Sequence, residues 1–274
     1  MLINRVSRQI MTCPELEPLV RALGAGDDAT LAVAQSARPL MLAAIWADDP
    51  RPCLFVVSGE EAADRAARAL AAWRGQDVVC RYPERRDYPW SEKAPEDSVV
   101  GARCRAVARL AEGERCIVVA SARSLLRRVP PAGSGYWASS TFAVGDEVPF
   151  DEVPALLVGM GYADNGEVDV PGSFHVHGDA VDVFPAQATT PVRIEFFGDE
   201  IDRVRRMVAA TGQTIGELKS VTVSPCREMA LTDETVARAE ETLYVRAQND
   251  NALAADLELI GARAAQPALE RYLP

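Results

Sequence analysis

A chain of 274 residues has room for about two domains, and its composition is that of an ordinary globular protein. No apolar run approaches the ~20 residues that a membrane span needs, and the N-terminus lacks the features of a secretory signal. The formal net charge of −11 at pH 7 argues against a broad phosphate-binding surface as the main activity. We therefore expect a cytoplasmic protein, with no membrane contact, that works by contacting other proteins.

The first part of the chain alternates between helical and strand patterns. Helical patterns cover 13–24, 38–47, 60–73, 98–110 and 121–128, and strand patterns cover 29–34, 53–57, 77–82 and 116–120. The continuous apolar runs at 53–57 and 116–120 are typical of strands buried on both faces. This alternation predicts a doubly wound parallel sheet, interrupted by an irregular proline-rich loop at 83–97.

The pattern changes after a linker at 130–135, Pro-Pro-Ala-Gly-Ser-Gly. The next segments predict an α+β section, with a strand at 140–144, a helix at 150–162, paired strands within 171–207 and a strand at 220–223. From 231 to 270 the chain is mainly helical, and Thr232 and Asp233 are capping signals at its start.

The densest strand signal lies in residues 171–207, where β-forming side chains alternate with polar ones. If the apolar residues at 192, 194 and 196 face a core, then Arg193, Glu195 and Phe197 share the opposite face. This face is either covered by a second buried layer or exposed as a docking surface, since aromatic residues and arginine are enriched at binding hot spots.

A nucleotide site is not supported by the first turn between a strand and a helix, residues 32–42. A phosphate loop needs glycines, a Lys for the phosphates and a Ser or Thr for Mg²⁺. This turn contains no glycine, and Ser36-Ala37-Arg38 stands where Gly-Lys-Ser/Thr is required. Arg38 is able to contact a phosphate, but it cannot bind Mg²⁺.

Metal binding is also not the favoured interpretation. The six cysteines include no Cys-x-x-Cys pair, which predicts reduced, mostly buried thiols. His175 and His177 share one face of a strand and could clamp a metal, but no further ligand is assigned by spacing, so surface histidines are favoured. The neighbouring carboxylates are typical of solvent-facing strands and turns, and they are Asp179, Asp182, Glu195, Asp199, Glu200 and Asp202.

Several motifs together resemble the bacterial transcription-repair coupling factors and, more loosely, their relative UvrB. The first is Pro191-Val-Arg-Ile-Glu-Phe-Phe-Gly-Asp-Glu-Ile-Asp-Arg-Val-Arg205, and the preceding strand pair at 172–185 is similar in both groups. The loop at 82–95 and the segment at 268–274 resemble further parts of the same module. The resemblance therefore covers nearly the whole chain.

The resemblance implies an α/β UvrB-homology module. Residues 1–131 would form a degenerate RecA-like parallel-sheet domain without a functional phosphate loop, and residues 132–218 an inserted α+β domain that binds UvrA. Residues 219–274 would form a mainly helical segment that packs on the first domain. Because members of this family are far longer, we expect the chain to be a monomeric fragment of a longer protein.

The resemblance also implies where UvrA would bind. Arg193 and Phe197 fall on positions that contact UvrA in the family, and Glu195 lies between them on the same strand face. His175 and His177 stand where UvrB-like sequences place arginines. A neutral histidine removes a permanent charge from this surface, which would weaken UvrA binding unless the partner surface has changed with it.

We therefore predict an N-terminal module of a coupling factor that recruits nucleotide-excision repair by binding UvrA, with no catalysis and no cofactor of its own. ATP, Mg²⁺, RNA polymerase and double-stranded DNA would be bound by other domains of the parent protein, an ATP-dependent DNA translocase. One alternative is a UvrB-like nucleotide-dependent DNA-binding enzyme, which would bind ATP at 33–40. Another is a free-standing adaptor whose reading frame ends near residue 274.

Overall fold

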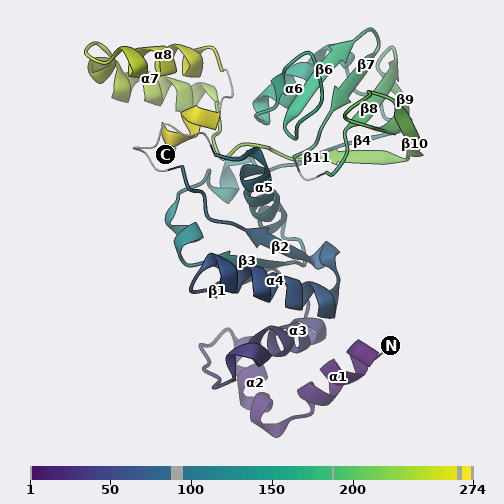
Figure 1. Cartoon of the computed structure of the whole chain (residues 1–274), viewed down its shortest axis with the longest axis vertical. Helices are drawn as coiled ribbons and strands as arrows, with labels where there is room; N and C mark the ends of the chain where they lie inside the picture. Colours follow the sequence, from purple (N-terminus) through teal and green to yellow (C-terminus); the bar gives the residue numbers. More distant parts are fainter. Residues whose placement is uncertain (1, 88–94, 187, 264–266, 273–274) are drawn as a thin grey trace. The chain divides into compact units, whose positions relative to one another are not determined.

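The structure is a computed structural model that describes residues 2–87, 95–186, 188–263 and 267–272. The chain divides into two compact units (Figure 1). Unit 1 comprises Met1–Glu84 with Gly113–Leu126, and unit 2 comprises Arg85–Glu112 with Arg127–Pro274. Half of the proline-rich loop expected at 83–97 lies outside the described residues. None of the helices within the described ranges is long and apolar enough to cross a membrane.

Unit 1 is built on a parallel sheet. Its described strands are β1 (Cys53–Val57), β2 (Val79–Tyr82) and β3 (Ile117–Ser121), in the order β1-β3-β2. Both β1 and β2 pair in parallel with β3, so the predicted parallel sheet is confirmed. The α-helices of this unit are α1 (Leu2–Met11), α2 (Glu17–Ala25), α3 (Arg38–Asp48) and α4 (Glu60–Arg74).

One face of this sheet is covered by α4, and α3 packs against α4. Ala43 of α3 and Ala63 and Ala66 of α4 belong to one buried apolar cluster with Ile117 and Val119 of β3. Alanine has the highest helix propensity and its small side chain lets each helix approach the sheet closely. The alanine-rich helical patterns of the sequence are therefore also the packing surface of unit 1.

Some expectations for unit 1 are wrong. Residues 29–34 form no strand, because half of them are alanines, which are depleted in strands, and they lead into the 3₁₀ turn Gln35–Ala37. β1 lies at the end of the described sheet, so Leu54 and Val56 are 47% and 44% exposed and the strand is not buried on both faces. β3, in the middle, is fully buried as expected. The helix expected at 121–128 is the 3₁₀ turn Arg123–Leu126.

Unit 2 contains a larger, mostly antiparallel sheet, with described strands in the order β10-β9-β8-β7-β6-β5. They are β5 (Ala163–Asp164), β6 (Ser173–His177), β7 (Ala180–Val183), β8 (Val192–Phe197), β9 (Glu200–Met207) and β10 (Thr214–Leu218). β4 (Ser140–Ala143) pairs separately with β11 (Ser220–Val223). The strands expected at 140–144, within 171–207 and at 220–223 are thus confirmed.

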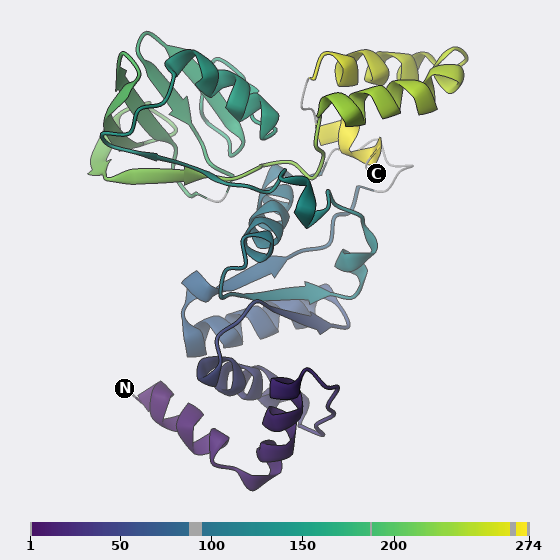
Figure 2. The same cartoon turned by 180° about the vertical axis from the view of Figure 1, so that it is seen from behind.

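A helix of unit 2 packs against the large sheet and precedes its strands in the chain. α6 (Val153–Gly159) packs Val153 and Leu157 into the core beneath β7 and β8 (Figure 2). It is shorter than the helix expected at 150–162, because Phe150–Glu152 is a 3₁₀ turn. The other helices are α5 (Asp97–Ala111), α7 (Asp233–Ala247), which Thr232 caps as expected, and α8 (Asn251–Gly261).

A buried cluster of charges joins distant parts of unit 2. Arg103 of α5 donates through Nε to Oε1 of Glu228 at 2.7 Å, and Arg85 donates to Oε2 of the same carboxylate at 3.0 Å. Arg85 also bonds Glu270, and two of its nitrogens bond Asp87 at 2.9 and 2.6 Å. Burial raises the pKa of Glu270, although the charge of Arg85 acts in the opposite direction. The cluster connects segments of unit 2 that the sequence separates by more than a hundred positions.

Replacing Gly161 by alanine is expected to destabilise unit 2 by about 2 kcal/mol or more. Gly161 has φ +88°, and an added Cβ would lie 2.6 Å from Cγ of Arg227. Gly178 is a matched control, because it has φ +59° and an added Cβ would meet nothing within 4 Å. Chemical unfolding should show a clearly larger loss for Gly161→Ala than for Gly178→Ala, and equal losses would contradict this close approach.

Candidate protein-binding face

The outward face of the large sheet carries the residues that the sequence singled out. On β8, Val192, Ile194 and Phe196 are buried in the core, so the predicted alternation is confirmed. Phe197 is 82% exposed, which excludes a second buried layer over this end of the strand. Exposed aromatic residues are enriched at binding hot spots, which makes this end of the strand a candidate contact site. We call this outward side of β6–β9 the docking face.

Arg193 is held by a carboxylate of its own sheet. Its Nε and Nη2 donate to Oδ1 and Oδ2 of Asp182 on β7, at 2.7 and 2.8 Å. The two residues are opposite each other in the β7–β8 register, and Asp182 is buried. The hydrogen bonds with Asp182 raise the pKa of Arg193 above its ordinary value. The guanidinium is therefore fixed in place before any partner arrives.

Glu195 is also paired within the sheet. Its Oε2 accepts a hydrogen bond from Nη2 of Arg205 on β9 at 2.5 Å. In the β8–β9 register, Arg193 is opposite Arg205 and Glu195 is opposite Arg203. Like charges opposite each other on a sheet repel, and the carboxylates of Asp182 and Glu195 neutralise this repulsion. Each of the two carboxylates thus holds an arginine of the neighbouring strand on the docking face.

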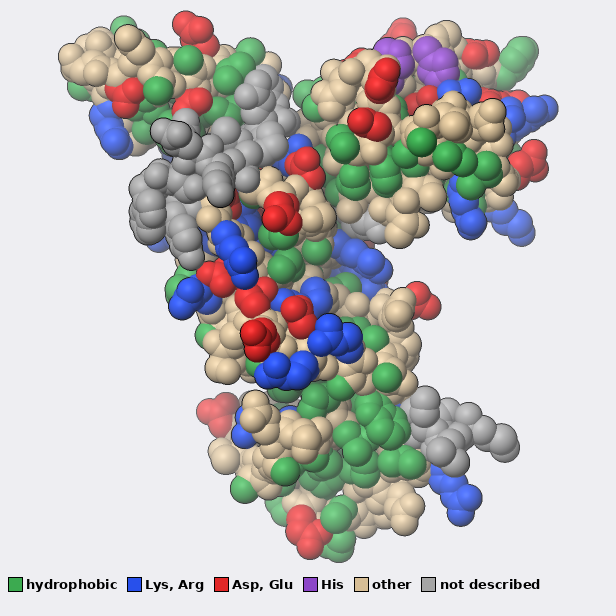
Figure 3. Space-filling view, in the orientation of Figure 1, with side chains coloured by type: hydrophobic (Ala, Val, Ile, Leu, Met, Phe, Trp, Pro, Cys, Tyr) green, Lys and Arg blue, Asp and Glu red, His purple; other side chains and the backbone are tan. Residues whose placement is uncertain are grey.

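His175 and His177 lie at the β6 end of the docking face. Their rings stack with centroids 6.0 Å apart (Figure 3). Nδ1 of His175 lies 3.0 Å from Oδ1 of Asp164, and Nε2 of His177 lies 3.9 Å from Oδ2 of Asp182. Burial alone would raise the pKa of Asp164, but hydrogen bonds with His175 and the backbone N–H of Gly166 lower it. In the part of the chain that is described, no three His, Cys, Asp or Glu side chains are grouped to hold a metal ion.

The remaining acidic residues of the sequence motif lie in two turns and at exposed positions of β9, where they are Glu200 and Asp202. Asp179 follows Gly178 in the turn between β6 and β7, and Asp199 follows Gly198 in the turn between β8 and β9. The carboxylate of Asp199 accepts a hydrogen bond from the backbone N–H of Phe150 at 3.0 Å. The turn predicted at Gly198-Asp199 is therefore confirmed.

Sequence reasoning did not identify Asp182 and Arg205 as the partners of Arg193 and Glu195. The pairing depends on which residues of β7, β8 and β9 are opposite each other, and the turn lengths alone leave that register open. The signal that could have found them is the presence of acidic and basic side chains at outward positions of three successive strands.

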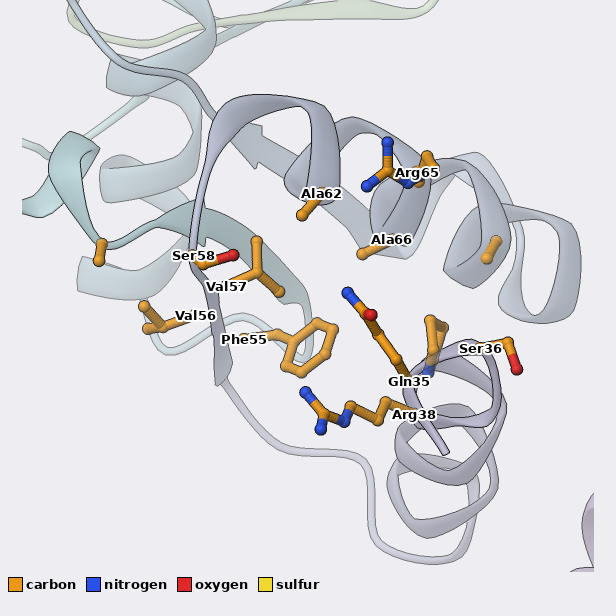
Figure 4. Close-up of a pocket in the computed structure, with 13 residues that line it drawn as sticks. Gln35, Ser36, Arg38, Phe55, Val56, Val57, Ser58, Ala62, Arg65 and Ala66 are labelled. Atoms are coloured by element: carbon orange, nitrogen blue, oxygen red, sulfur yellow. The ribbon is translucent and has the colours of Figure 1, made fainter. Parts of the chain in front are cut away.

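A cavity lies where the sequence predicted a failed phosphate loop. It has a volume of about 860 Å³ and is lined by the start of α3, by β1 and by α4. Figure 4 shows Arg38 at the start of α3 extending toward Phe55, and Gln35 of the turn before it extending toward Ala66. Arg65 of α4 also lines it. The turn before α3 contains neither the glycines nor the lysine that hold a triphosphate.

One known protein family matches the part of the chain that contains these residues. The model of the UvrB interaction domain family matches residues 141–229. Residues 141–229 are thus similar to UvrB interaction domains, and we refer to them by that name. They contain the docking face, from His175 to Arg205, and also Glu228 of the buried charge cluster.

The similarity extends on both sides of the UvrB interaction domain. The chain is 35% identical over 223 residues to the transcription-repair-coupling factor of Myxococcus xanthus, which covers 79% of this chain and 19% of that protein. The chain is also 35% identical over 243 residues to the transcription-repair-coupling factor of Mycobacterium bovis, and the match covers 84% of this chain and 19% of that protein. UvrABC system protein B of Levilactobacillus brevis is 33% identical over 158 residues, and this match covers 57% of the chain and 24% of that protein. The chain thus spans about a fifth of the coupling factors it matches, and the predicted resemblance is confirmed.

Proposed function

We propose that the UvrB interaction domain of this chain binds UvrA and so recruits nucleotide-excision repair, without catalysis of its own. The observation that carries this proposal is Phe197, an almost fully exposed aromatic ring beside Arg193 in residues 141–229. Burying a Phe side chain in a partner contributes about 1.5–3 kcal/mol. The coupling-factor relatives support a role in which transcription and repair are linked.

Each residue of the docking face would have a different role in binding UvrA. Phe197 would insert into an apolar pocket of UvrA, and Arg193 would present its remaining nitrogen, Nη1, with its orientation already fixed by Asp182. Glu195, His177 and His175 would form the polar surroundings that exclude water from the contact.

The rest of the chain would serve as a scaffold for this contact. Residues 1–131 would be a degenerate RecA-like domain, residues 132–218 the inserted UvrA-binding domain, and residues 219–274 a helical segment that completes the first domain. The parallel order β1-β3-β2 with helices along the chain supports this assignment. RNA polymerase and double-stranded DNA would be bound by other parts of a longer cytoplasmic protein with a working translocase.

The proposal is tested by titrating UvrA into the labelled 274-residue chain and following fluorescence anisotropy. Saturable binding at micromolar concentration or tighter, lost on substitution of Phe197, is the expected result. A chain that shows no saturable binding to UvrA would remove the proposed function.

A second candidate, nucleotide binding, is favoured only by the cavity next to Arg38. We expect calorimetric titration with Mg·ATP to give no saturable heat, because the turn lacks the glycines and lysine that hold phosphates. Micromolar affinity that falls in Arg38→Gln and remains in the control Arg68→Gln, at an exposed position of α4 outside the cavity lining, would instead support the UvrB-like enzyme.

A further inference from the structure

The three arginines of the docking face differ in how firmly they are held. Arg193 is bound through two hydrogen bonds to a buried carboxylate, and the side chains of Arg205 and Glu195 are both mostly buried. Among the residues that the structure describes, Arg203 pairs with its chain neighbour Asp202, with Nε 3.4 Å from Oδ2, and these two side chains are 55% and 56% exposed. Of the three arginines, Arg203 is thus the one whose guanidinium is bound most weakly within the face.

A β-bulge gives Arg203 this position. The register of β8 and β9 shifts between Glu195 and Phe196, so that Glu195 is opposite Arg203 while Phe196 is opposite Ile201. Asp202 is the extra residue of β9. Paired residues point to the same face of a sheet, so Arg203 lies on the docking face next to the strand that carries Phe197.

The energies of these ion pairs decide which arginine is available to a partner. An exposed pair contributes about 0–1 kcal/mol, so Arg203 exchanges Asp202 for another carboxylate at little cost. Arg193 would have to leave Asp182 buried without its ion pair, which is strongly unfavourable. A partner carboxylate is therefore expected to approach the exposed side of the face, beside Phe197.

We propose that Arg203 is the residue of the docking face that contacts a carboxylate of the partner, and that Asp202 competes with that carboxylate for it. This inference rests on the proposed binding of UvrA and deepens it: the UvrA surface would present an acidic side chain beside the apolar pocket that receives Phe197. Arg193 then stays paired with Asp182 and contributes to the shape of the face. Arg203 on β9 provides the positive charge that His175 and His177 lack.

The test is a titration of UvrA with variants of the 274-residue chain, each measured at low and at high salt. Arg203→Gln is expected to weaken binding about fivefold and to reduce its salt dependence. Arg206→Gln is the matched control, because Arg206 is exposed on the same strand but is opposite Val192, whose side chain enters the core. Its binding should equal that of the wild type.

Asp202→Asn is expected to change the affinity for UvrA in the direction opposite to Arg203→Gln. It should tighten binding about twofold to threefold in the wild type and leave the affinity of Arg203→Gln unchanged, since Asp202 would act through Arg203. Wild-type affinity in Arg203→Gln, while Phe197→Ala still loses binding, would overturn the role of Arg203 and leave the proposed function standing. No binding of UvrA by the wild type would overturn both.

Discussion

Replacing Phe197 by alanine is expected to weaken the binding of UvrA by about 30-fold or more. The ring is exposed at the end of β8, and the opposite side of this strand is locked into the core by Phe196. Removing an exposed ring leaves no cavity, so the free energy of unfolding should stay unchanged. The binding loss is measured by anisotropy titration, and the stability is measured by chemical unfolding.

A matched control for this substitution is Tyr244→Ala. Tyr244 is an exposed aromatic residue on α7, outside the UvrB interaction domain. It should retain wild-type affinity, which separates loss of a particular ring from loss of apolar surface in general. Phe197→Ala also tests binding more directly than Arg193→Ala. The latter leaves the buried Asp182 without its ion pair and so also affects the stability of the fold. If Phe197→Ala binds UvrA as tightly as the wild type, the docking face is wrongly placed.

Replacing Glu228 by glutamine is expected to lower the free energy of unfolding of unit 2 by about 3 kcal/mol or more. The carboxylate is completely buried and accepts hydrogen bonds from both Arg85 and Arg103. Glutamine has nearly the same shape, so the change removes charge and leaves both guanidinium groups with less compensation in a dry environment. Chemical unfolding followed by circular dichroism measures the loss.

The control for this prediction is Glu234→Gln. Glu234 forms an exposed pair with Arg238 one turn along α7, and such pairs contribute about 0.3–0.5 kcal/mol. A loss for Glu228→Gln as small as that for Glu234→Gln would mean that the buried cluster contributes little to stability. UvrA affinity at low denaturant concentration serves as a second readout of whether the docking face stays folded.

The sequence allowed the local features of the docking face to be predicted, because they depend on a single strand. The alternation of apolar and polar side chains along 192–197 is enough to separate Phe196 from Phe197. Residues 29–34 were assigned wrongly because a short alanine-rich apolar run also fits an extended loop. Local patterns of this kind do not show which residues of a neighbouring strand a side chain will face.

Contacts between distant residues could not be predicted in the same way. Arg85 and Glu270 are 185 positions apart and meet only once the elements of unit 2 have assembled. In the sequence each looks like an ordinary solvated charge, since arginine and glutamate are rarely buried without a partner. The pairing of Asp182 with Arg193 likewise depends on the strand register.

The bulge at Asp202 makes β9 tolerant of a change in length at one position. Deleting Asp202 would bring Ile201 and Arg203 together in regular alternation, with Ile201 still facing the core and Arg203 still facing out. A deletion elsewhere in β9 would turn every following side chain to the opposite face. Insertions and deletions among natural variants of this hairpin should therefore cluster at residue 202, where the strand can lose a residue without exchanging its inner and outer surfaces.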